Sequence, residues 1–537
     1  MRARKTGGIF GSAALAGAMV FVVLYGVHIL NPMYTDWLMY KGDLSQHYLG
    51  WRAFRNSTWT FPIGLTDQLS YPYYTSIMYT DSIPIVAIIV KVFSPLLPKT
   101  FQYFGMYGML CFILNSILTA KIVKKYSDSR IIMVMSGVFI NFSPAMLNRM
   151  FRHTALASIW LILLAFLSLI FYEEYFANTK RAVAFWALLG GLIGGIHLYY
   201  LLFCGIILAG YCVLDILNTH KIGRSIKSVG SYLFATVSIV YLIGGFSGHL
   251  QASSEGLGHF SFNLLGLFNP MGWSCVFDDL PLYTKDQYEG FSYLGAGVFA
   301  LLVCTGFQLL YRKVKCKKEW KINKNKVIAS VFIAILSVIA AASPIITFGP
   351  YKVVQLPIPQ LIWKMWEVFR SSGRAIWVVV YMILFWAICA DVKQIGMRAK
   401  IGIMSFCMIL QIYDIHVILY EKHNRFAIRT CYETMLTSPI WNQIAESDIL
   451  HIVLASQLDQ NMLYSLADYA LDHKMTLNDF YFARSKSDAV YEARRAAKVN
   501  IEGNRLYIFL PGDFDNEYAG FNIYEADGLI LCYTGEL

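Results

Sequence analysis

The sequence is poor in charge. Only 15% of its 537 residues are Asp, Glu, Lys or Arg, whereas 57% are hydrophobic and the mean hydropathy is +0.49. Soluble domains average about 25% charged residues, so this composition excludes a soluble fold and predicts an integral membrane protein. Negatively charged residues are the scarcer kind, with 34 Asp and Glu against 45 Lys and Arg. Because the basic residues lie in short clusters between hydrophobic runs, they indicate membrane orientation, and no nucleic-acid partner is expected.

The chain also lacks the short motifs that bind nucleotides or metals. It has no Walker A sequence, no GxGxxG fingerprint and, among its ten cysteines, no CxxC pair. Most cysteines lie inside apolar runs and are interpreted as small core residues. Cys431 and Cys532 could pair outside the membrane, with two unpaired thiols as the alternative. No internal repeat stands out, which weakens the case for a transporter built from repeats.

Hydropathy and basic clusters together predict an α-helical polytopic protein with about 11 transmembrane helices in residues 1–420. Arg2, Arg4 and Lys5 precede the first apolar run and place the N-terminus in the cytoplasm. The apolar run 83–98 is short and contains prolines. If this run is a re-entrant or juxtamembrane helix and is not counted as a span, every strongly basic turn lies in the cytoplasm. The three long loops then all lie on the outer side. The spans are expected near 9–30, 100–122, 131–147, 155–172, as a pair around His197, and near 229–246, 292–311, 327–343, 375–391 and 401–420.

From residue 421 the composition changes to that of a small α/β domain. Its length of about 115 residues is within the usual range for a domain, and the topology places residues 421–537 outside the cell. Alternating and amphipathic patterns predict strands at 447–456, 479–485 and 504–511, and helices at 461–474 and 487–499.

The first outer loop is the most informative segment of the chain. A connection of some 50 residues without an apolar span is uncommon and usually functional, and with the juxtamembrane run it extends over 31–98. Asp43 precedes apolar residues at helical spacing, which predicts a helix lying along the membrane interface. An outer-face carboxylate can accept a proton from an attacking hydroxyl, so Asp43 is the predicted base; an ordinary helix N-cap is the alternative. Asp81 ranks second and Asp36 third, while Asp67 is given no role.

Basic residues near the outer ends of two spans form the second candidate set. Arg370 and Arg374 lie in FRSSGRAIW, and Arg152 and His153 lie in the short loop NRMFRHT. Guanidinium groups match phosphate oxygens in geometry and charge, so these residues could hold a leaving phosphate. The alternative for any one arginine is snorkelling to lipid headgroups.

Two further side chains have both a functional and a local interpretation. Trp59 and its aromatic neighbours fit either a sugar-stacking surface or an interfacial aromatic belt, and the belt is the simpler explanation. His197 is interpreted as a packed, hydrogen-bonded histidine, since no metal ligands cluster around it in the sequence.

The order of these features resembles the GT-C superfamily of membrane glycosyltransferases, in its protein-mannosyltransferase and aminoarabinose-transferase branch. The similarity covers about the first 200 residues by order of features and the remainder by topology. It implies Asp43 as the catalytic base, Asp81 as an ancillary carboxylate, and Arg370 and Arg374 as lipid-phosphate contacts. Asp43 is followed by Leu-Ser, so the acidic pair typical of metal-binding members is absent. No metal ligand is predicted, and a requirement for a divalent cation is left open. The similar segments are DLSQHY (43–48), TWTFP (58–62) and TDSIP (80–84).

The sequence therefore predicts an inverting glycosyltransferase of the bacterial plasma membrane. Its donor would be a hexosyl or pentosyl unit on polyprenyl phosphate or diphosphate, and its acceptor a glycan, lipid or protein of the cell envelope. The predicted site consists of Asp43 and Asp81, with Arg370, Arg374, Arg152, His153, Asp36 and Trp59 as substrate contacts. The alternatives are a polymerase or ligase of lipid-linked glycans, and a non-enzymatic transporter, which should carry charges in mid-span.

Overall fold

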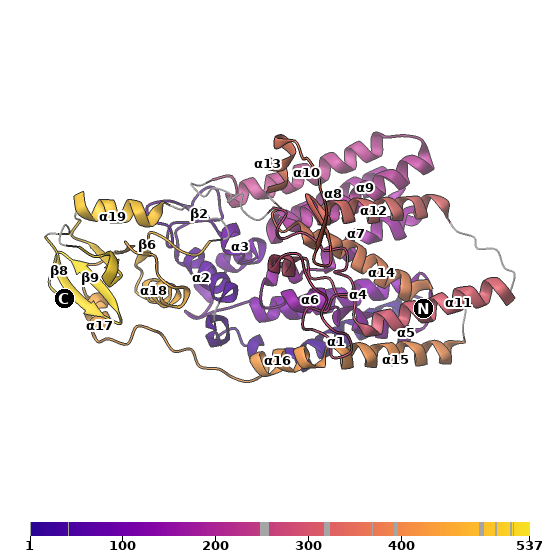
Figure 1. The fold of residues 1–537 in the computed structure, drawn as a ribbon, viewed down its shortest axis with the longest axis horizontal. Helices are drawn as coiled ribbons and strands as arrows, with labels where there is room; N and C mark the ends of the chain where they lie inside the picture. The colour runs from indigo at the N-terminus through magenta and orange to yellow at the C-terminus, as the bar shows by residue number, and fades with distance from the viewer. Residues whose placement is uncertain are drawn as a thin grey trace.

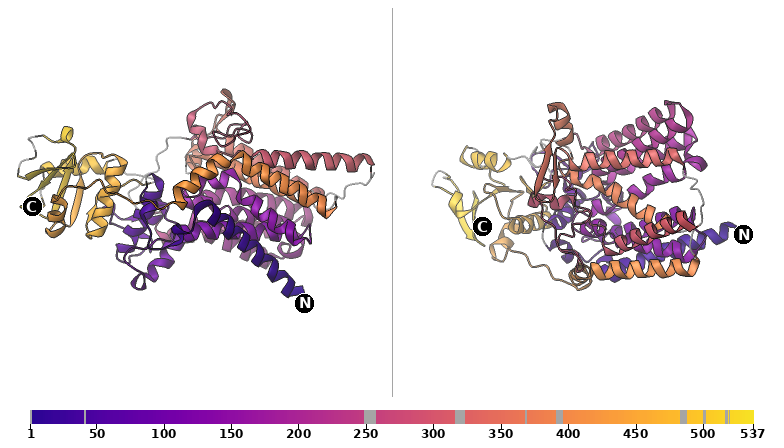
Figure 2. Two further views of the ribbon diagram at one scale, coloured as in Figure 1. Left: turned by 90° about the horizontal axis from the view of Figure 1, so that it is seen from below. Right: turned by 45° about the vertical axis from the view of Figure 1, so that its right-hand side comes forward.

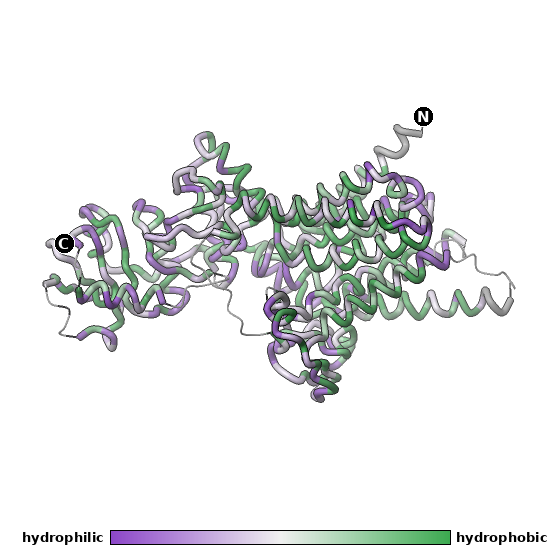
Figure 3. Tube along the Cα trace, turned by 90° about the horizontal axis from the view of Figure 1, so that it is seen from above, coloured by the Kyte–Doolittle hydropathy of each residue, from purple (hydrophilic) through white to green (hydrophobic). Residues whose placement is uncertain are grey.

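In the computed structural model, a bundle of long helices is capped at one end by the C-terminal domain (Figure 1). The two termini lie at opposite ends of the molecule (Figure 2). Hydrophobic residues dominate the helical bundle, whereas the C-terminal domain alternates between hydrophobic and hydrophilic (Figure 3). The structure describes the whole chain except residues 1, 41, 248–256, 316–322, 368, 391–395, 483–487, 500–501, 516–517 and 519.

Helices occupy the positions at which hydropathy predicts spans, although several are shorter than a full span. Within the described ranges, six helices are long and apolar enough to cross a membrane, and a bent pair at residues 397–427 would make a seventh. The chain is thus a multi-pass membrane protein, while the number of 11 spans stays a prediction. The helices at the expected positions are α1 (Arg2–Tyr25), α4 (Phe104–Lys124), α5 (Arg130–Asn141), α7 (Trp160–Ile170), α8 (Thr179–Ile196), α9 (Tyr199–Thr219), α10 (Gly223–Ile243), α11 (Ala296–Lys315), α12 (Lys324–Ala342), α14 (Trp377–Ala390), α15 (Met397–Asp414) and its continuation α16 (His416–Ala427).

Small residues allow α8 and α10 to pack closely near the site. A Cβ atom on Gly190 would lie 2.3 Å from the backbone oxygen of Tyr232, and one on Gly194 would lie 2.9 Å from that of Thr236. Glycines four residues apart lie on one helix face and let two backbones approach in a membrane. This contact fixes the end of α8, where the chain turns at His197.

The first loop folds into short elements at the end of the bundle. The helix α3 has nine residues, which at 1.5 Å per residue is far less than a bilayer requires. Most residues of helix α2 are buried within the protein, including Ser45, Gln46 and His47, whereas its spacing suggested one apolar face turned to the membrane interface. The C-terminal helix α18 (Gln460–Asp472) covers its outer side (Figure 1). The loop elements are η2 (Asp36–Met39), α2 (Asp43–Asn56), β1 (Leu65–Thr66), β2 (Thr75–Ser76), η3 (Ile77–Thr80) and α3 (Pro84–Val92).

A five-stranded sheet forms the core of the C-terminal domain, in the order β6-β5-β7-β9-β8. The strand β5 pairs parallel with β6 and β7, whereas β9 pairs antiparallel with β7 and β8. The final hairpin β8–β9 was not anticipated. Neither Cys431, which is exposed, nor Cys532, which is buried, forms a disulfide. The elements are α17 (Ile440–Glu446), β5 (His451–Leu454), α18, β6 (Thr476–Leu477), α19 (Ala489–Val499), β7 (Arg505–Phe509), β8 (Asn522–Ala526) and β9 (Leu529–Tyr533).

The strand predicted at 479–485 is wrong over its described part. Residues 479–482 have no strand structure, and 483–485 lie outside the described residues. The alternation that suggested a strand is real, since Phe480 and Phe482 are buried and Tyr481 between them is not. The apolar pair anchors the segment to the domain, while Tyr481 reaches the cavity described below.

Ion pairs and backbone hydrogen bonds join the C-terminal domain to the first loop. On α2, Arg52 contacts Asp468 and Asp472 of α18, the latter at 2.6 Å between Nη2 and Oδ1. The backbone N–H of Leu477 donates to the oxygen of Gln68 at 2.8 Å. The domain is therefore fastened to the same helix that carries Asp43.

We expect Arg52→Met to loosen this attachment. The partly buried carboxylate of Asp468 would lose its counter-charge, and the exposed Asp472 would keep only Lys99 at 3.9 Å, at a total cost of about 1–3 kcal/mol. Limited proteolysis should then cleave residues 428–439 faster than in the wild-type protein. Arg505→Met is the matched control, since Arg505 pairs with Glu502 inside the domain; equal cleavage of both variants would contradict the role given to Arg52.

Candidate active site

A cavity of about 600 Å³ opens at the end of the bundle that faces the C-terminal domain. Residues from seven separate parts of the chain line it: the first loop, the turn after α6 (Pro144–Arg149), the junction of α8 and α9, the end of α10, the second long loop, the segment before α14 and the C-terminal domain. The polar lining residues are Asp43, Gln46, His47, Tyr79, Asp81, Arg152, His153, His197, Tyr199, Tyr288, Glu289, Arg370, Ser371, Arg374 and Tyr481.

Six of the eight predicted site residues line this cavity, and two do not. Asp36 lies in a second cavity of about 330 Å³, between the first loop and residues 430–435. Trp59 is half exposed, and the ammonium of Lys91 lies 4.6 Å from its ring centroid. The six that meet in the main cavity are Asp43, Asp81, Arg152, His153, Arg370 and Arg374.

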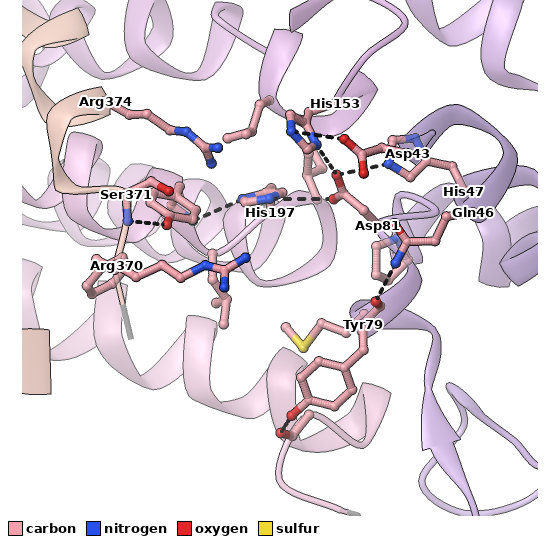
Figure 4. A pocket seen from close by; sticks show the side chains of 18 of the residues that line it. Asp43, Gln46, His47, Tyr79, Asp81, His153, His197, Arg370, Ser371 and Arg374 are labelled. Atoms are coloured by element: carbon pink, nitrogen blue, oxygen red, sulfur yellow. Dashed lines mark hydrogen bonds and ion pairs between the residues drawn. The ribbon is translucent and has the colours of Figure 1, made fainter. Parts of the chain in front are cut away.

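Helix α2 positions Asp43 and His47 together. Asp43 is the first residue of the helix, and Gly42 occupies the N-cap with φ +70° and ψ −151°, a conformation that favours glycine. The N-cap role considered for Asp43 is thus taken by Gly42. His47 follows one turn later, and residues four apart share a helix face. Both side chains therefore point to the same end of the cavity (Figure 4).

Asp81 lies in a strained turn between η3 and α3. Its φ is +54°, and Ile83 two residues later also has φ +54°. A left-handed conformation is rare for any side-chain-bearing residue and exceptional for a β-branched one. Strain of this kind is concentrated at functional sites. The turn directs the Asp81 carboxyl group to the centre of three histidines.

The three histidines come from different elements and surround Asp81 (Figure 4). His47 Nε2 lies 3.4 Å and His153 Nδ1 4.0 Å from Asp81 Oδ2, while His197 Nε2 lies 3.5 Å from Oδ1. The other nitrogen of His153, Nε2, lies 3.3 Å from Asp43 Oδ2. His153 thus stands between the two carboxyl groups.

Burial controls the protonation of this cluster. It raises the pKa of Asp43, against the nearby charge of Arg152, which lowers it. Burial and the charge of Asp43 together raise the pKa of Asp81 to about 8. Burial also lowers the pKa of His47 to about 3. Because burial keeps the histidine rings neutral, their contacts with the carboxyl groups of Asp43 and Asp81 are not salt bridges.

Glu289 holds two arginines on the adjoining wall. Its Oε2 lies 2.8 Å from Arg149 Nη2 and accepts a hydrogen bond of 3.1 Å from Arg374 Nε. Although burial opposes ionisation, the two guanidinium groups hold the pKa of Glu289 below its usual range. By contrast, Arg152 and Arg370 form no ion pair with any described residue. Arg152 and Arg370 therefore carry the positive charges in the cavity that are free to bind an anionic ligand.

Sequence patterns did not indicate a role in the site for four further lining residues, His47, His197, Glu289 and Tyr481. His47 could have been found, because it follows Asp43 at helical spacing. His197 was interpreted as a packed histidine, yet it contacts Asp81. Glu289 ends a long loop without any motif, and Tyr481 belongs to a segment interpreted as a strand.

The cluster also contains groups that could hold a metal ion. One ligand atom each from His47, Asp81 and His153 lie within 4.8 Å of one another. Such mixed imidazole and carboxylate sets bind divalent transition metals.

Two related family models match the helical part and the C-terminal part of the chain. A family model described as "Domain of unknown function (DUF6311)" matches residues 14–416, and "DUF6311 C-terminal domain" matches 440–534. No curated protein matches the sequence. Similar solved structures include an Archaeoglobus fulgidus oligosaccharyltransferase tethered with an acceptor peptide (12% identity, TM-score 0.43, covering 93% of this chain and 69% of that one). Another is ArnT from Cupriavidus metallidurans bound to undecaprenyl phosphate (11% identity, TM-score 0.41, covering 98% of each chain).

Proposed function

The chain belongs to the DUF6311 family, and we propose that this member is an inverting glycosyltransferase with a lipid-linked donor. The donor is a sugar on polyprenyl phosphate or diphosphate, and the acceptor is a hydroxyl-bearing molecule of the cell envelope. The observation that carries this proposal is the cavity itself. It combines two carboxyl groups, Asp43 and Asp81, with two guanidinium groups, Arg152 and Arg370, that have no described carboxylate partner.

Asp43 is the proposed general base. Its side chain is 26% exposed, so an acceptor hydroxyl can reach it. Burial raises its pKa, and the ionised form of a carboxyl group with a raised pKa accepts a proton more readily. His153, 3.3 Å away, orients the carboxylate. Asp43 takes the hydroxyl proton as the acceptor oxygen attacks the anomeric carbon.

The arginines receive the leaving group. As the bond between the anomeric carbon and the phosphate oxygen breaks, negative charge returns to the phosphate. Arg370 and Arg152 can each donate charge-assisted hydrogen bonds to its oxygens. Attack from the side opposite the phosphate inverts the anomeric centre. Arg374, bound to Glu289, supports the wall and is not assigned a phosphate contact in this proposal.

Apolar side chains line another part of the same cavity. Met78, Val240, Phe246 and Phe260 line it together with the polar groups. A polyprenyl chain requires such a surface next to its phosphate, because apolar groups gain free energy by leaving water. This juxtaposition supports a lipid-linked donor over a soluble one.

Sidedness follows from the positive-inside rule and is also part of the proposal. The basic turn after α4, with Lys121, Lys124 and Lys125, adjoins the start of α1, where the guanidinium of Arg130 donates to Ser12 Oγ. The N-terminus lies at the end of the molecule opposite the C-terminal domain (Figure 2). Basic turns are cytoplasmic in most membrane proteins. The cavity and the C-terminal domain are accordingly placed outside the cell.

A reconstituted assay distinguishes this function from its rivals. Purified protein in liposomes is supplied with polyprenyl-phosphate sugars and a cell-envelope extract, and both sugar transfer and release of polyprenyl phosphate are measured. We expect the two to appear in equal amounts. A labelled lipid that changes leaflet with no transfer would support a transporter instead, and release of lipid from a growing glycan would support a polymerase.

We expect Arg370→Gln to weaken donor binding. A charge-assisted hydrogen bond contributes about 1.5–3 kcal/mol, which corresponds to roughly a 10- to 150-fold rise in KM for the donor. Steady-state kinetics should show a smaller change in kcat. Arg398→Gln, at an exposed position on α15, is the control. An unchanged KM in the Arg370 variant would remove this residue from the phosphate site.

A further inference from the structure

His47 is the least explained side chain in the cavity. It is completely buried on α2, and neither ring nitrogen has a hydrogen-bond partner among the described residues. Its Nε2 points to Asp81 Oδ2 at 3.4 Å without hydrogen-bond geometry (Figure 4). Buried polar groups are nearly always paired, so an unpaired buried imidazole in a polar cavity points to a bound ligand.

The distances around His47 fit a metal ion. Metal–ligand bonds of about 2.0–2.1 Å in tetrahedral geometry separate neighbouring ligand atoms by about 3.3 Å. His47 Nε2 and Asp81 Oδ2 are 3.4 Å apart, and His153 Nδ1 is 4.0 Å from the same oxygen. Small side-chain rotations would bring the third ligand to bonding distance. The three ligand atoms together lie within 4.8 Å of one another.

The neighbours of these three residues make the contacts that support metal ligands. A ligating histidine usually donates its other N–H to a carboxylate, and His153 Nε2 lies 3.3 Å from Asp43. A ligating carboxylate is itself hydrogen-bonded, and His197 Nε2 lies 3.5 Å from the second oxygen of Asp81.

The backbone fixes the tautomer of His197. The N–H of Tyr199 donates to His197 Nδ1 at 3.1 Å, so the neutral ring carries its proton on Nε2. An Nε2–H faces Asp81 as a donor and cannot ligate a metal. His197 is therefore a positioning residue for Asp81.

We propose that His47 Nε2, His153 Nδ1 and Asp81 bind a divalent transition-metal ion such as Zn²⁺. The remaining coordination position opens into the 600 Å³ cavity. Two imidazoles and one carboxylate favour Zn²⁺, Mn²⁺, Fe²⁺ or Co²⁺ over Mg²⁺ and Ca²⁺, which prefer oxygen ligands. The strained turn at Asp81 and Ile83, which holds the carboxylate between the two histidines, is explained as the cost of building this site.

The site does not depend on the proposed reaction, and its test measures binding. Full-length protein is purified in detergent with a tag that contains no histidine. Zn²⁺ binding is measured by equilibrium dialysis, and Co²⁺ serves as a spectroscopic probe through its visible absorption. We expect one high-affinity Zn²⁺ per chain and a Co²⁺ band that Zn²⁺ abolishes.

Variants test the ligands and the positioning residues separately. His47→Gln and Asp81→Asn should abolish high-affinity binding, whereas His197→Gln should weaken it about 10- to 100-fold. His473→Gln, which removes an exposed histidine of the C-terminal domain, is the control and should bind as wild type.

Two results would overturn the inference. One is wild-type protein that binds no Zn²⁺ or Co²⁺ at micromolar concentrations. The other is full binding in both His47→Gln and Asp81→Asn. Because these variants could fail to fold, X-ray absorption at the zinc edge of the wild-type protein provides a second measurement: nitrogen and oxygen ligands support the site, and sulfur ligands contradict it.

Discussion

Asp43→Asn should lower the rate of sugar transfer by about 10²- to 10⁴-fold, the usual contribution of a positioned general base. The amide keeps the size of the side chain but cannot take the acceptor proton at neutral pH. Because Asp43 is partly exposed at the first position of α2, with Gly42 providing the N-cap, the helix should remain intact. The measurement is kcat with a polyprenyl-phosphate sugar in liposomes, together with the thermal unfolding temperature.

The matched control for this prediction is Asp67→Asn. Asp67 lies in the same loop but does not line the cavity. Its variant should transfer sugar at the wild-type rate. Asp43→Glu, which keeps the carboxylate at a shifted position, should retain more activity than the asparagine variant. If Asp43→Asn transferred sugar as fast as wild type, Asp43 would not be the base.

Glu289→Gln should destabilise the fold by about 3–5 kcal/mol, the usual cost of removing one partner from a buried ion pair. Glu289 compensates two buried guanidinium groups, those of Arg149 and Arg374. With a neutral amide in its place, both positive charges would remain buried beside each other. We expect a fall in the unfolding temperature, measured in detergent.

A surface carboxylate provides the comparison. Glu502 pairs with Arg505 three residues along the chain, and its side chain is 40% exposed. Glu502→Gln should change the stability by less than about 1 kcal/mol, as exposed pairs do. Equal stability of the two variants would show that Glu289 is not the electrostatic centre of the wall. A double variant, Glu289→Gln with Arg149→Met, should recover part of the loss, because it removes one uncompensated charge.

Hydropathy located the long helices because burial in lipid imposes a local requirement on sequence. A helix that crosses a bilayer needs about 20 apolar residues, and this signal is visible without tertiary contacts. The helix α3 was predicted to be too short for a span, because counting it as one would have placed the Lys and Arg clusters outside the cell. The environment of α2 was not recognised. Its apolar face suggested a membrane interface, whereas that face is buried in the protein, with Trp51 packed against Tyr103.

The candidate site was predictable in part. Asp43, Asp81 and the arginines were selected because carboxylates and guanidinium groups at a membrane face suit phosphate chemistry, and they do share one cavity. Asp36 and Trp59 were selected by the same rule and lie elsewhere. The rule takes account of residue type and loop, but not of the direction in which a side chain points.

The sequence by itself determined a multi-pass membrane protein with an acidic first loop and a separate C-terminal segment. These features depend on composition and on periodicity over some 20 residues. Only the tertiary structure decided that His47, His153 and His197 surround Asp81, that Glu289 neutralises Arg374, and that Tyr481 lines the cavity. The physical reason is that these groups meet through the packing of helices far apart in the chain, which no local pattern records.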